Sequence, residues 1–316
     1  MDLSAFLLVL FLSSLFACLN GVEGSIELSA REDLELENQL KVLNKPAVKT
    51  IQTEYGDKYD CVDFYNQPAF DHPLLKNHSF YFEYAVVRTR PGAGKFNGAG
   101  AAFSLHQPKV SSGQHSEARL KIENGVEAIQ VGWRVDPDLY GDTRTRAFIR
   151  VDAGQSHCFN TRCPGFVLVR SDIPLDGIYE KTSKYGGQAI EIYRYIQRDL
   201  ANGNWWLRIG DDNTPIGFWP KRIFRDLAGS ASYVDWGGKV YTPPGTKAPE
   251  MGSGHFLERD TKYDAFFRNI QVINDFGKNV NTFNTETFND IGLYDVADIK
   301  NAQSFGHLVL YGGPPE

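Results

Sequence analysis

This 316-residue sequence lacks the motifs of several common catalytic and binding sites. No G-x-S-x-G or H-E-x-x-H motif occurs, which argues against an α/β-hydrolase serine and against a common type of zinc peptidase. The seven histidines are scattered and no His/Cys pair has zinc-ligand spacing, so we expect no metal ion and no cofactor. A net charge of −6 offers no basic face for nucleic acid.

Long apolar runs are also scarce. Only residues 3–19 approach the length of a membrane span. Small residues follow, and this order is typical of a secretory signal peptide that is cut after Gly21 or Gly24. Asp2 stands where a basic residue is expected, and an uncleaved anchor is the alternative. We expect a secreted protein, extracellular or vacuolar, with no membrane association after cleavage.

Cysteine is rare, at four residues, and Cys18 falls in the predicted signal peptide. Cys158 and Cys163 have four residues between them, which in a secretory compartment predicts a small disulfide loop. Two free thiols are the alternative, and Cys61 is left as the odd cysteine. Asn77 begins the one N-x-S/T sequon, which would be glycosylated if it is exposed in the secretory pathway.

Aromatic residues, by contrast, are abundant, at 13% of the chain. They favour pleated, half-buried surfaces. From about residue 100 onward, short strand-like runs alternate with turn signals such as Asn124-Gly125. This density predicts an all-β fold, an antiparallel β-sandwich or barrel. The expected strands are 100–107, 117–123, 126–135, 145–152, 165–170, 188–196, 204–210, 215–219, 230–241, 265–273 and 306–311.

The residues before position 100 follow another pattern. Leu36, Leu40 and Leu43 recur on one helical face, and Pro46 ends this helix. Residues 56–79 hold many turn formers and are expected to be irregular. Residues 88–100 are glycine-rich and basic, which is typical of a linker; they lack the G-x-G-x-x-G spacing of a phosphate-binding loop. We divide the chain into a signal peptide (1–24), a small helical and irregular prosegment (25–87), a linker (88–100) and a β-sandwich (101–316).

Two regions carry a resemblance to a known family. Residues 40–78 resemble the activation peptide of neprosins, and the remainder resembles the neprosin catalytic domain. The resemblance runs in order from about residue 40 to residue 316. The matching stretches are IQVGWRVDPDLYGDTRTRAFIRVDAG (129–154), CFNTRCPGFV (158–167), NWWLRIGD (204–211), IGFWPKRIF (216–224), ASYVDWGGKV (231–240), PEMGSGHF (249–256) and AFFRNIQV (265–272).

Neprosins are plant proline-directed glutamic endopeptidases that work in acid. The resemblance therefore implies a glutamic-peptidase-like sandwich, lectin-like in architecture, with a concave substrate face. It implies a site in which one carboxylate activates water and a second group polarises the scissile carbonyl. It also implies a prosegment that is removed or covers the cleft, with residues 88–95 as the expected cut region.

The two positions that match the family's catalytic glutamates do not hold carboxylates here. Gln130 comes before the G-W pair with a single residue between, and Lys239 directly follows W-G-G. A glutamine amide can donate to an oxyanion but cannot take a proton from water. Lysine, with a reference pKa near about 10.4, is a cation in acid and has no free lone pair. Asp235 faces the same way as Lys239 on a regular strand, roughly 13 Å away, and is the candidate for a relocated acid.

Aromatic residues flank both positions. Trp133 and Trp236 are candidates to line the cleft and pack proline rings, although most large aromatics of a sandwich are core. Strand alternation puts Trp205 and Trp206 on opposite faces, so at most one of them lines a groove. Glu127, three residues before Gln130, is expected on the other side of its strand.

Three functions remain open, and the enzyme assignment is undecided. The first is a secreted, catalytically impaired pseudo-peptidase that keeps its cleft. The second is an active acid post-proline endopeptidase with a relocated carboxylate. The third is a carbohydrate- or cell-wall-binding β-sandwich, for which fold alone is weak support. The expected partners are a proline-containing peptide or cell-wall protein in the cleft and the chain's own prosegment; we expect a monomer.

Overall fold

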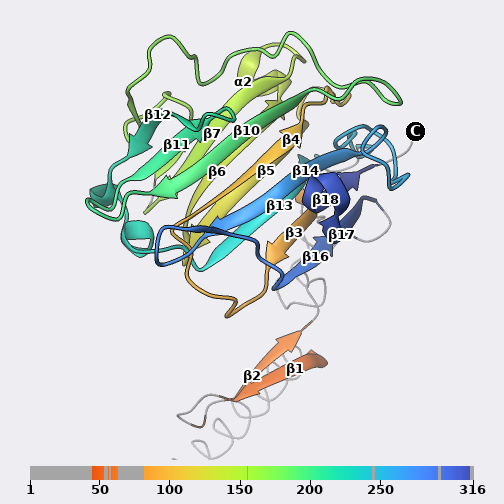
Figure 1. Cartoon of the computed structure of the whole chain (residues 1–316). Helices are drawn as coiled ribbons and strands as arrows, with labels where there is room; N and C mark the ends of the chain where they lie inside the picture. Colours follow the sequence, from red (N-terminus) through yellow and green to blue (C-terminus); the bar gives the residue numbers. More distant parts are fainter. Residues whose placement is uncertain are drawn as a thin grey trace, which may run out of the picture. The chain divides into compact units, whose positions relative to one another are not determined.

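The computed structural model describes residues 45–52, 56, 58–62, 82–154, 156–243, 246–290 and 293–313. The chain divides into two compact units, Met1–Ser79 and Phe80–Glu316. In the first unit, strands β1 (Ala47–Gln52) and β2 (Lys58–Val62) form an antiparallel hairpin (Figure 1). Strand β2 corrects the expectation of irregular chain from residue 56. The predicted signal peptide, the leucine-patterned helix and Asn77 lie outside the described residues.

The second unit is a sandwich of two antiparallel sheets, which confirms the predicted fold class. Within the described residues, one sheet has the order β17-β18-β14-β4-β10-β11-β12-β9, with β15 paired to β14, and the other has the order β16-β3-β13-β5-β6-β7-β8 (Figure 1). The strands of the first sheet are β4 (Gly98–Ser104), β9 (Val167–Leu168), β10 (Glu191–Arg198), β11 (Trp205–Ile209), β12 (Thr214–Trp219), β14 (Ala265–Ile273), β15 (Asn279–Val280), β17 (Asp295–Ala302) and β18 (Gly306–Gly312). Those of the second are β3 (Phe82–Thr89), β5 (His115–Asn124), β6 (Glu127–Val135), β7 (Arg146–Ala153), β8 (Ser156–Phe159), β13 (Tyr233–Tyr241) and β16 (Thr285–Asn289).

Short helices connect some of these strands. Helix α2 (Pro137–Tyr140) begins at Asp136, whose side chain accepts a hydrogen bond from the Leu139 backbone N–H and so caps the helix. The 3₁₀ turns are η3 (Lys221–Ile223), η4 (Asp226–Ala228) and η5 (Gln303–Phe305). Turns η3 and η4 lie between β12 and β13, and η4 packs against β5 and β6.

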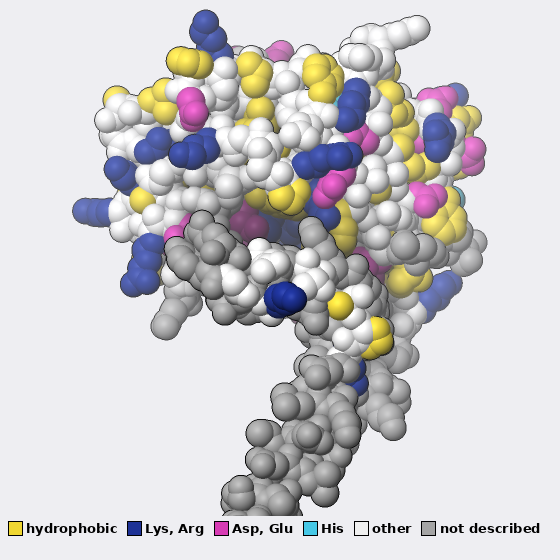
Figure 2. All heavy atoms as spheres, turned by 90° about the horizontal axis from the view of Figure 1, so that it is seen from below, with side chains coloured by type: hydrophobic (Ala, Val, Ile, Leu, Met, Phe, Trp, Pro, Cys, Tyr) yellow, Lys and Arg dark blue, Asp and Glu magenta, His cyan; other side chains and the backbone are white. Residues whose placement is uncertain are grey.

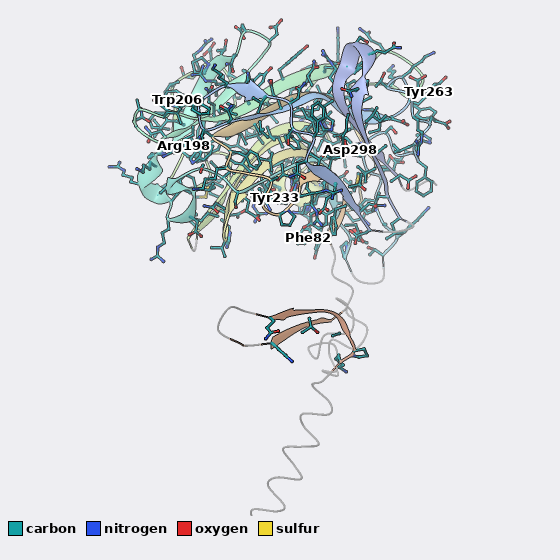
Figure 3. All side chains as sticks on the ribbon, turned by 60° about the horizontal axis from the view of Figure 1, so that its bottom comes forward. Phe82, Arg198, Trp206, Tyr233, Tyr263 and Asp298 are labelled. Atoms are coloured by element: carbon teal, nitrogen blue, oxygen red, sulfur yellow. A yellow bond between two sulfur atoms is a disulfide. The ribbon has the colours of Figure 1, made fainter. Side chains whose placement is uncertain are left out.

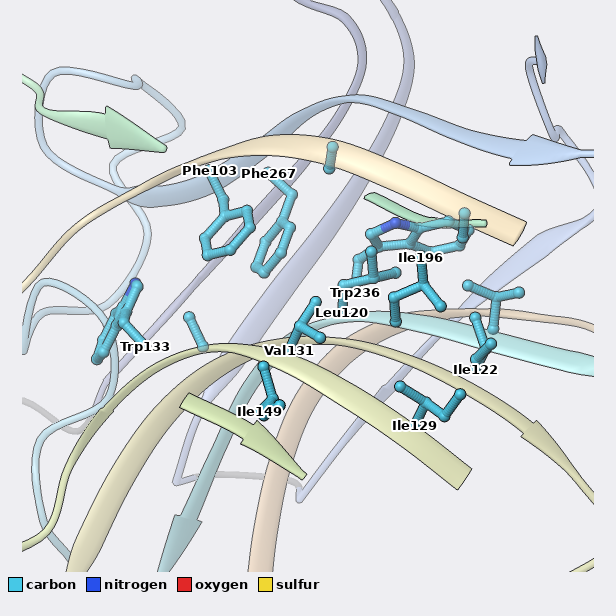
Figure 4. Packing of buried hydrophobic residues seen from close by; sticks show 14 of the residues in the cluster. Phe103, Leu120, Ile122, Ile129, Val131, Trp133, Ile149, Ile196, Trp236 and Phe267 are labelled. Carbon is cyan, nitrogen blue, oxygen red and sulfur yellow. The ribbon is translucent and has the colours of Figure 1, made fainter. Parts of the chain in front are cut away.

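The core lies between the two sheets because successive side chains of a strand alternate between its faces. On β6, Ile129, Val131 and Trp133 point inward and are fully buried. Phe103 and Phe267 of the opposite sheet stack with ring centroids 4.6 Å apart (Figure 4). Burying each such side chain contributes about 1.5–3 kcal/mol, so this layer dominates the stability of the unit.

Each of the eleven expected runs contains a strand, but β3 corrects the expected domain boundary. This strand lies between β16 and β13 in the second sheet, although most of it was expected to belong to the prosegment. The compact unit accordingly begins at Phe80, not near residue 100. The expected linker is a turn between β3 and β4, two strands of different sheets.

Glu127 anchors the turn η4 to the end of β6. Its side chain is 1% exposed, and its carboxylate accepts hydrogen bonds from the backbone N–H groups of Arg225, Asp226 and Leu227 at 2.7–3.1 Å. The Gly154 N–H donates to the same carboxylate at 3.2 Å. Several backbone donors that face one charge form stronger hydrogen bonds than neutral pairs do.

We expect Glu127→Gln to lower the free energy of unfolding by about 2–4 kcal/mol, because the amide loses charge-assisted bonds and leaves buried donors poorly matched. Urea unfolding of the two proteins measures the difference. Glu123→Gln is the matched control, since Glu123 is partly exposed beside Lys121 and should cost less than about 1 kcal/mol. Equal effects of the two substitutions would contradict this role for Glu127.

Candidate active site

The sheet that contains β3, β13 and β5 to β8 has a charged face on the side that points away from the core. Alternation places polar side chains of β13, β5, β6 and β7 on this face, while their neighbours enter the core. Figure 2 shows acidic and basic side chains near one another on this side of the second unit. The members that form the site are Glu117, Arg119, Gln130, Arg134, Arg150, Asp152, Asp235 and Lys239.

Strand register arranges these side chains in rows across β6, β5 and β13. The first row is Gln130–Lys121–Asp235, the second is Gly132–Arg119–Gly237 and the third is Arg134–Glu117–Lys239. Gln130 and Lys239 therefore lie in different rows, on strands separated by β5. Their offset along the strand direction is four residues, roughly 13 Å. In its row, Gln130 lies beside Lys121 of β5, whereas Lys239 lies beside Glu117 of β5.

Gln130 is held from both ends of its amide. Arg119 Nη1 donates to Gln130 Oε1 at 3.0 Å, and Gln130 Nε2 donates to Asp152 Oδ2 at 3.2 Å. The second guanidinium nitrogen, Arg119 Nη2, donates to Asp235 Oδ2 at 3.1 Å. The buried guanidinium of Arg119 thus links Gln130 to Asp235, the acid that was expected as a replacement. As expected, Asp235 shares the face of Lys239.

Glycines on both neighbouring strands leave Arg119 as the only side chain of the middle row. A Cβ at Gly132 would lie 1.9 Å from the carbonyl oxygen of Ala118, and one at Gly237 would lie 2.2 Å from that of Ala85. Gly237 also has φ +150°, which a side chain rarely adopts. The glycines of the G-W and W-G-G stretches are therefore required by packing, and they shape the floor around Arg119.

Lys239 is bound to Glu117. Its Nζ lies 3.7 Å from Glu117 Oε1, and Arg134 Nη1 contacts the other carboxylate oxygen. Burial disfavours the cation and lowers the pKa of Lys239 to about 7, although Glu117 opposes this shift. Burial alone would raise the pKa of Glu117, but Lys239 and Arg134 outweigh it and hold that pKa well below its usual range. Glu117 is therefore an ionised partner and not a proton carrier.

Asp152 is the carboxylate nearest to Gln130 that sequence reasoning missed. Its Oδ1 accepts from Arg150 Nη2 at 2.9 Å and is 2.7 Å from His157 Nδ1, while Oδ2 accepts from Gln130. Asp152 lies 22 positions after Gln130 on the neighbouring strand, one diagonal step away. No spacing signal in the sequence reports a diagonal pair, since it depends on how β6 and β7 align.

The tryptophan expectation is corrected by the structure. Trp133 and Trp236 are fully buried in the core, on the opposite side of the sheet from Gln130 and Lys239, because an offset of three residues reverses the face of a strand. The indole N–H of Trp133 donates to the Ser104 carbonyl at 2.9 Å. Neither ring can line a groove on the charged face.

The expected disulfide between Cys158 and Cys163 is confirmed, with a Cα–Cα separation of 5.8 Å. It closes a short loop after β8, the edge strand that carries His157. In the described part of the chain, no helix is long and apolar enough to cross a membrane, and no group of three or more metal-binding side chains comes together.

Comparison with known proteins assigns the family. A family model described as Neprosin matches residues 102–314, and one described as Neprosin activation peptide matches residues 50–113. The first covers well over half of the chain. This protein belongs to the neprosin family. The activation-peptide match extends over β3 and β4, both of which pair within the sandwich.

Solved structures of similar arrangement include two peptidases. Scytalido-glutamic peptidase with a peptide-based transition state analog has 10% sequence identity and a TM-score of 0.43, covering 74% of this chain and 98% of that one. SCP-B, a member of the eqolisin family of peptidases in a complex with the tripeptide Ala-Ile-His, has 11% identity and a TM-score of 0.40, with the same coverage.

The lowered pKa of Lys239 predicts a pH-dependent stability. The pKa of native Lys239 is about 7, whereas in the unfolded chain the lysine has its ordinary pKa of 10.5. Between these values the unfolded state binds more protons, so the free energy of unfolding should rise with pH. Relative to Lys239→Met, the native protein should gain up to about 1.4 kcal/mol per pH unit above about pH 7.

Urea unfolding at several values between about pH 6 and pH 9 measures this difference. Lys109→Met serves as the control, because the Lys109 side chain is 79% exposed. Parallel pH profiles for the native protein and Lys239→Met would show that Lys239 keeps its proton throughout.

Proposed function

We propose that this neprosin-family protein binds proline-containing peptide chains on its charged face and has lost most of the hydrolytic activity of active members. We further propose that it is secreted, to an extracellular or vacuolar compartment. The Cys158–Cys163 disulfide is consistent with this, since such bonds persist in oxidising compartments. The activation-peptide match makes its own prosegment a partner.

The observation that carries the proposal is the bonding at positions 130 and 239. Gln130 is an amide fixed between Arg119 and Asp152, and Lys239 is a cation beside Glu117. In acid Lys239 is protonated, so neither side chain can take a proton from water. Both remain good hydrogen-bond donors for the carbonyl groups of a bound peptide.

The charge balance of the face supports binding over hydrolysis. Asp235 is paired with Arg119, Glu117 with Arg134 and Lys239, and Asp152 with Arg150. A carboxylate held by a cation is a weaker base than a free one, because the cation stabilises the ionised form. Glu117 is the clear case, because Lys239 and Arg134 outweigh burial and hold its pKa well below the usual range, so water activation there would work against its ion pairs.

The test is peptide cleavage in acid, followed by mass spectrometry, with proline-containing substrates. We expect the native protein to bind these peptides but not to cut them. A Gln130→Glu, Lys239→Glu double variant should cut after proline, because it restores a carboxylate at both positions. Gln130→Glu with Lys239→Met is the matched control, which removes the same cation without adding the second acid and should stay silent. Native turnover at a rate near that of the double variant would overturn the proposal.

A second candidate function is supported by Asp152. A carboxylate 3.2 Å from an amide is an arrangement in which one group can activate water and the other can hold an oxyanion. In this case the native protein would cut peptides, with Asp152 as the base. Asp152→Asn should then lower kcat at least about 100-fold, while Asp235→Asn, which also removes one buried acid, should have a much smaller effect. Equal losses in both variants would indicate structural damage and not loss of a base.

A further inference from the structure

A row of half-exposed aromatic side chains lies on the opposite side of the molecule. They lie on the sheet that contains β4, β10, β11 and β12, on the face that points away from the core. Tyr193 and Tyr195 of β10 are followed by Trp206 of β11 and Phe218 of β12. The rings of Trp206 and Phe218 have centroids 4.8 Å apart. Figure 3 labels Trp206 and Arg198 at the upper left and Tyr233, which by alternation shares the face of Asp235 on β13, lower in the view.

A register shift in β12 lies beside this row. Phe218 is the direct partner of Trp206, and the shift between Leu207 and Arg208 lets Ile216 point into the core even though it is two residues from Phe218. A regular strand would put both side chains on one face. The irregularity thus changes the face of Ile216, whereas Phe218 keeps the face of its direct partner Trp206.

The floor of the row is unusually flat. Gly100 lies directly across from Tyr195, and a Cβ at Gly100 would lie 2.0 Å from Cδ1 and 2.6 Å from Cε1 of the tyrosine ring. The ring therefore covers the glycine and lies along the sheet, which leaves its other face to solvent. Gln197 is the cross-strand partner of Trp206, and Arg208 is the partner of Tyr195. Planar hydrogen-bonding groups thus sit beside the exposed rings.

Two hollows flank the Trp206–Phe218 pair, and their charge is positive. One, of about 470 Å³, is lined by Arg198, Asp199, Trp206 and Arg208 among others; the second, of about 660 Å³, is lined by Phe218, Lys221 and Arg222 among others. These linings hold four basic side chains and one acidic one, on a chain of net charge −6. No ion pair of these four side chains is found among the residues that the structure describes; Arg198 donates to Asn97 and to the Ala228 carbonyl, and Arg208 donates to the Asn213 carbonyl.

We propose that this aromatic face binds an acidic linear polysaccharide, a polymer of uronic-acid rings. The C–H groups on the apolar face of a sugar ring pack against the electron-rich face of a flat aromatic ring. Arginine and amide side chains beside the rings can bind neighbouring hydroxyl and carboxylate oxygens in bidentate fashion. The positive charge of the two hollows, which is most exposed at Lys221 and Arg222, supplies the attraction for the carboxylates.

A proline-rich peptide is the less suited occupant. Proline rings also stack on aromatics, but such peptides are bound in aromatic-lined grooves that read a narrow helix. Here the rings are spread over three strands on one sheet face, with cations on both sides. That layout fits a broad ribbon with regularly spaced anionic groups.

Tryptophan fluorescence can test the site directly. Of the five tryptophans, Trp133, Trp205, Trp219 and Trp236 are fully buried, and only Trp206 reaches solvent. Quenching by acrylamide, an uncharged quencher, therefore reports mainly on Trp206. We expect polygalacturonate to protect it, with protection reduced by added salt.

Three other polymers separate the contributions to binding. Fully methyl-esterified polygalacturonate keeps the rings but loses the charge and should bind about tenfold more weakly, a difference of about 1.4 kcal/mol. Polyglutamate keeps the charge without sugar rings and should give no protection, and neither should a proline-rich peptide. Protection by polyglutamate would show that the site recognises charge and not sugar rings, which would overturn the proposal. Protection by the proline-rich peptide, or a lack of protection by polygalacturonate, would also overturn it. So would equal binding of the acid and its ester.

Variants complete the test with the full-length protein. Trp206→Leu should abolish retention on a polygalacturonate matrix, whereas Tyr185→Ala, an exposed aromatic elsewhere, should not change it. Lys221→Gln with Arg222→Gln should weaken binding of the acid and leave binding of the ester unchanged. Both side chains are exposed, so folding should be unaffected, which circular dichroism checks. Peptide cleavage is measured separately, so failure here leaves the proposed function of the charged face untouched.

Discussion

The charged face depends on the buried guanidinium of Arg119. A cation that is 4% exposed is tolerated only if it is paired and hydrogen-bonded, since removing it from water costs several kcal/mol. Arg119 meets this requirement by bridging Gln130 and Asp235, two residues on different strands. Its pairing fixes the orientation of both side chains, and the glycines at 132 and 237 leave the space that it occupies.

The same constraint explains why position 239 can hold a lysine. Glu117 is 2% exposed and needs positive charge nearby, and Arg134 and Lys239 both supply it. A carboxylate at 239 would face Glu117 in the same row, so one of the two would have to be protonated. In acid such sharing is accessible to two carboxylates, whereas the lysine, which is protonated below about pH 7, satisfies an ionised Glu117. The residue at 239 therefore decides whether this row can carry a catalytic proton or only a fixed ion pair.

The two outer faces of the sandwich are built differently. On the charged face, long polar side chains compensate one another row by row, and aromatic rings such as Trp133 turn into the core. On the opposite face, alternation places Trp206 and Phe218 outward as a cross-strand pair, and Gly100 leaves room for the ring of Tyr195. Both faces obey strand alternation, and the difference arises from the residue types that alternation places outward and from a glycine that provides room.

Much of this protein was predictable from local sequence. Short-range patterns predicted the strand-forming runs, the Cys158–Cys163 bond and the family. They also predicted that Asp235 and Lys239 share a face and that Glu127 lies on the other side of its strand, because the side chains of a strand alternate with a period of two. The expected runs did not include β3, which is followed by a glycine-rich stretch that was interpreted as a linker, nor β8, β15, β16 and β17. The burial of Trp133 and Trp236 was also missed. The sequence alone determined which residue types occupy the site. The tertiary structure decided which of them meet: Asp152 reaches Gln130, and Lys239 reaches Glu117, only through the alignment of neighbouring strands, which joins residues 22 and 122 positions apart and leaves no local pattern.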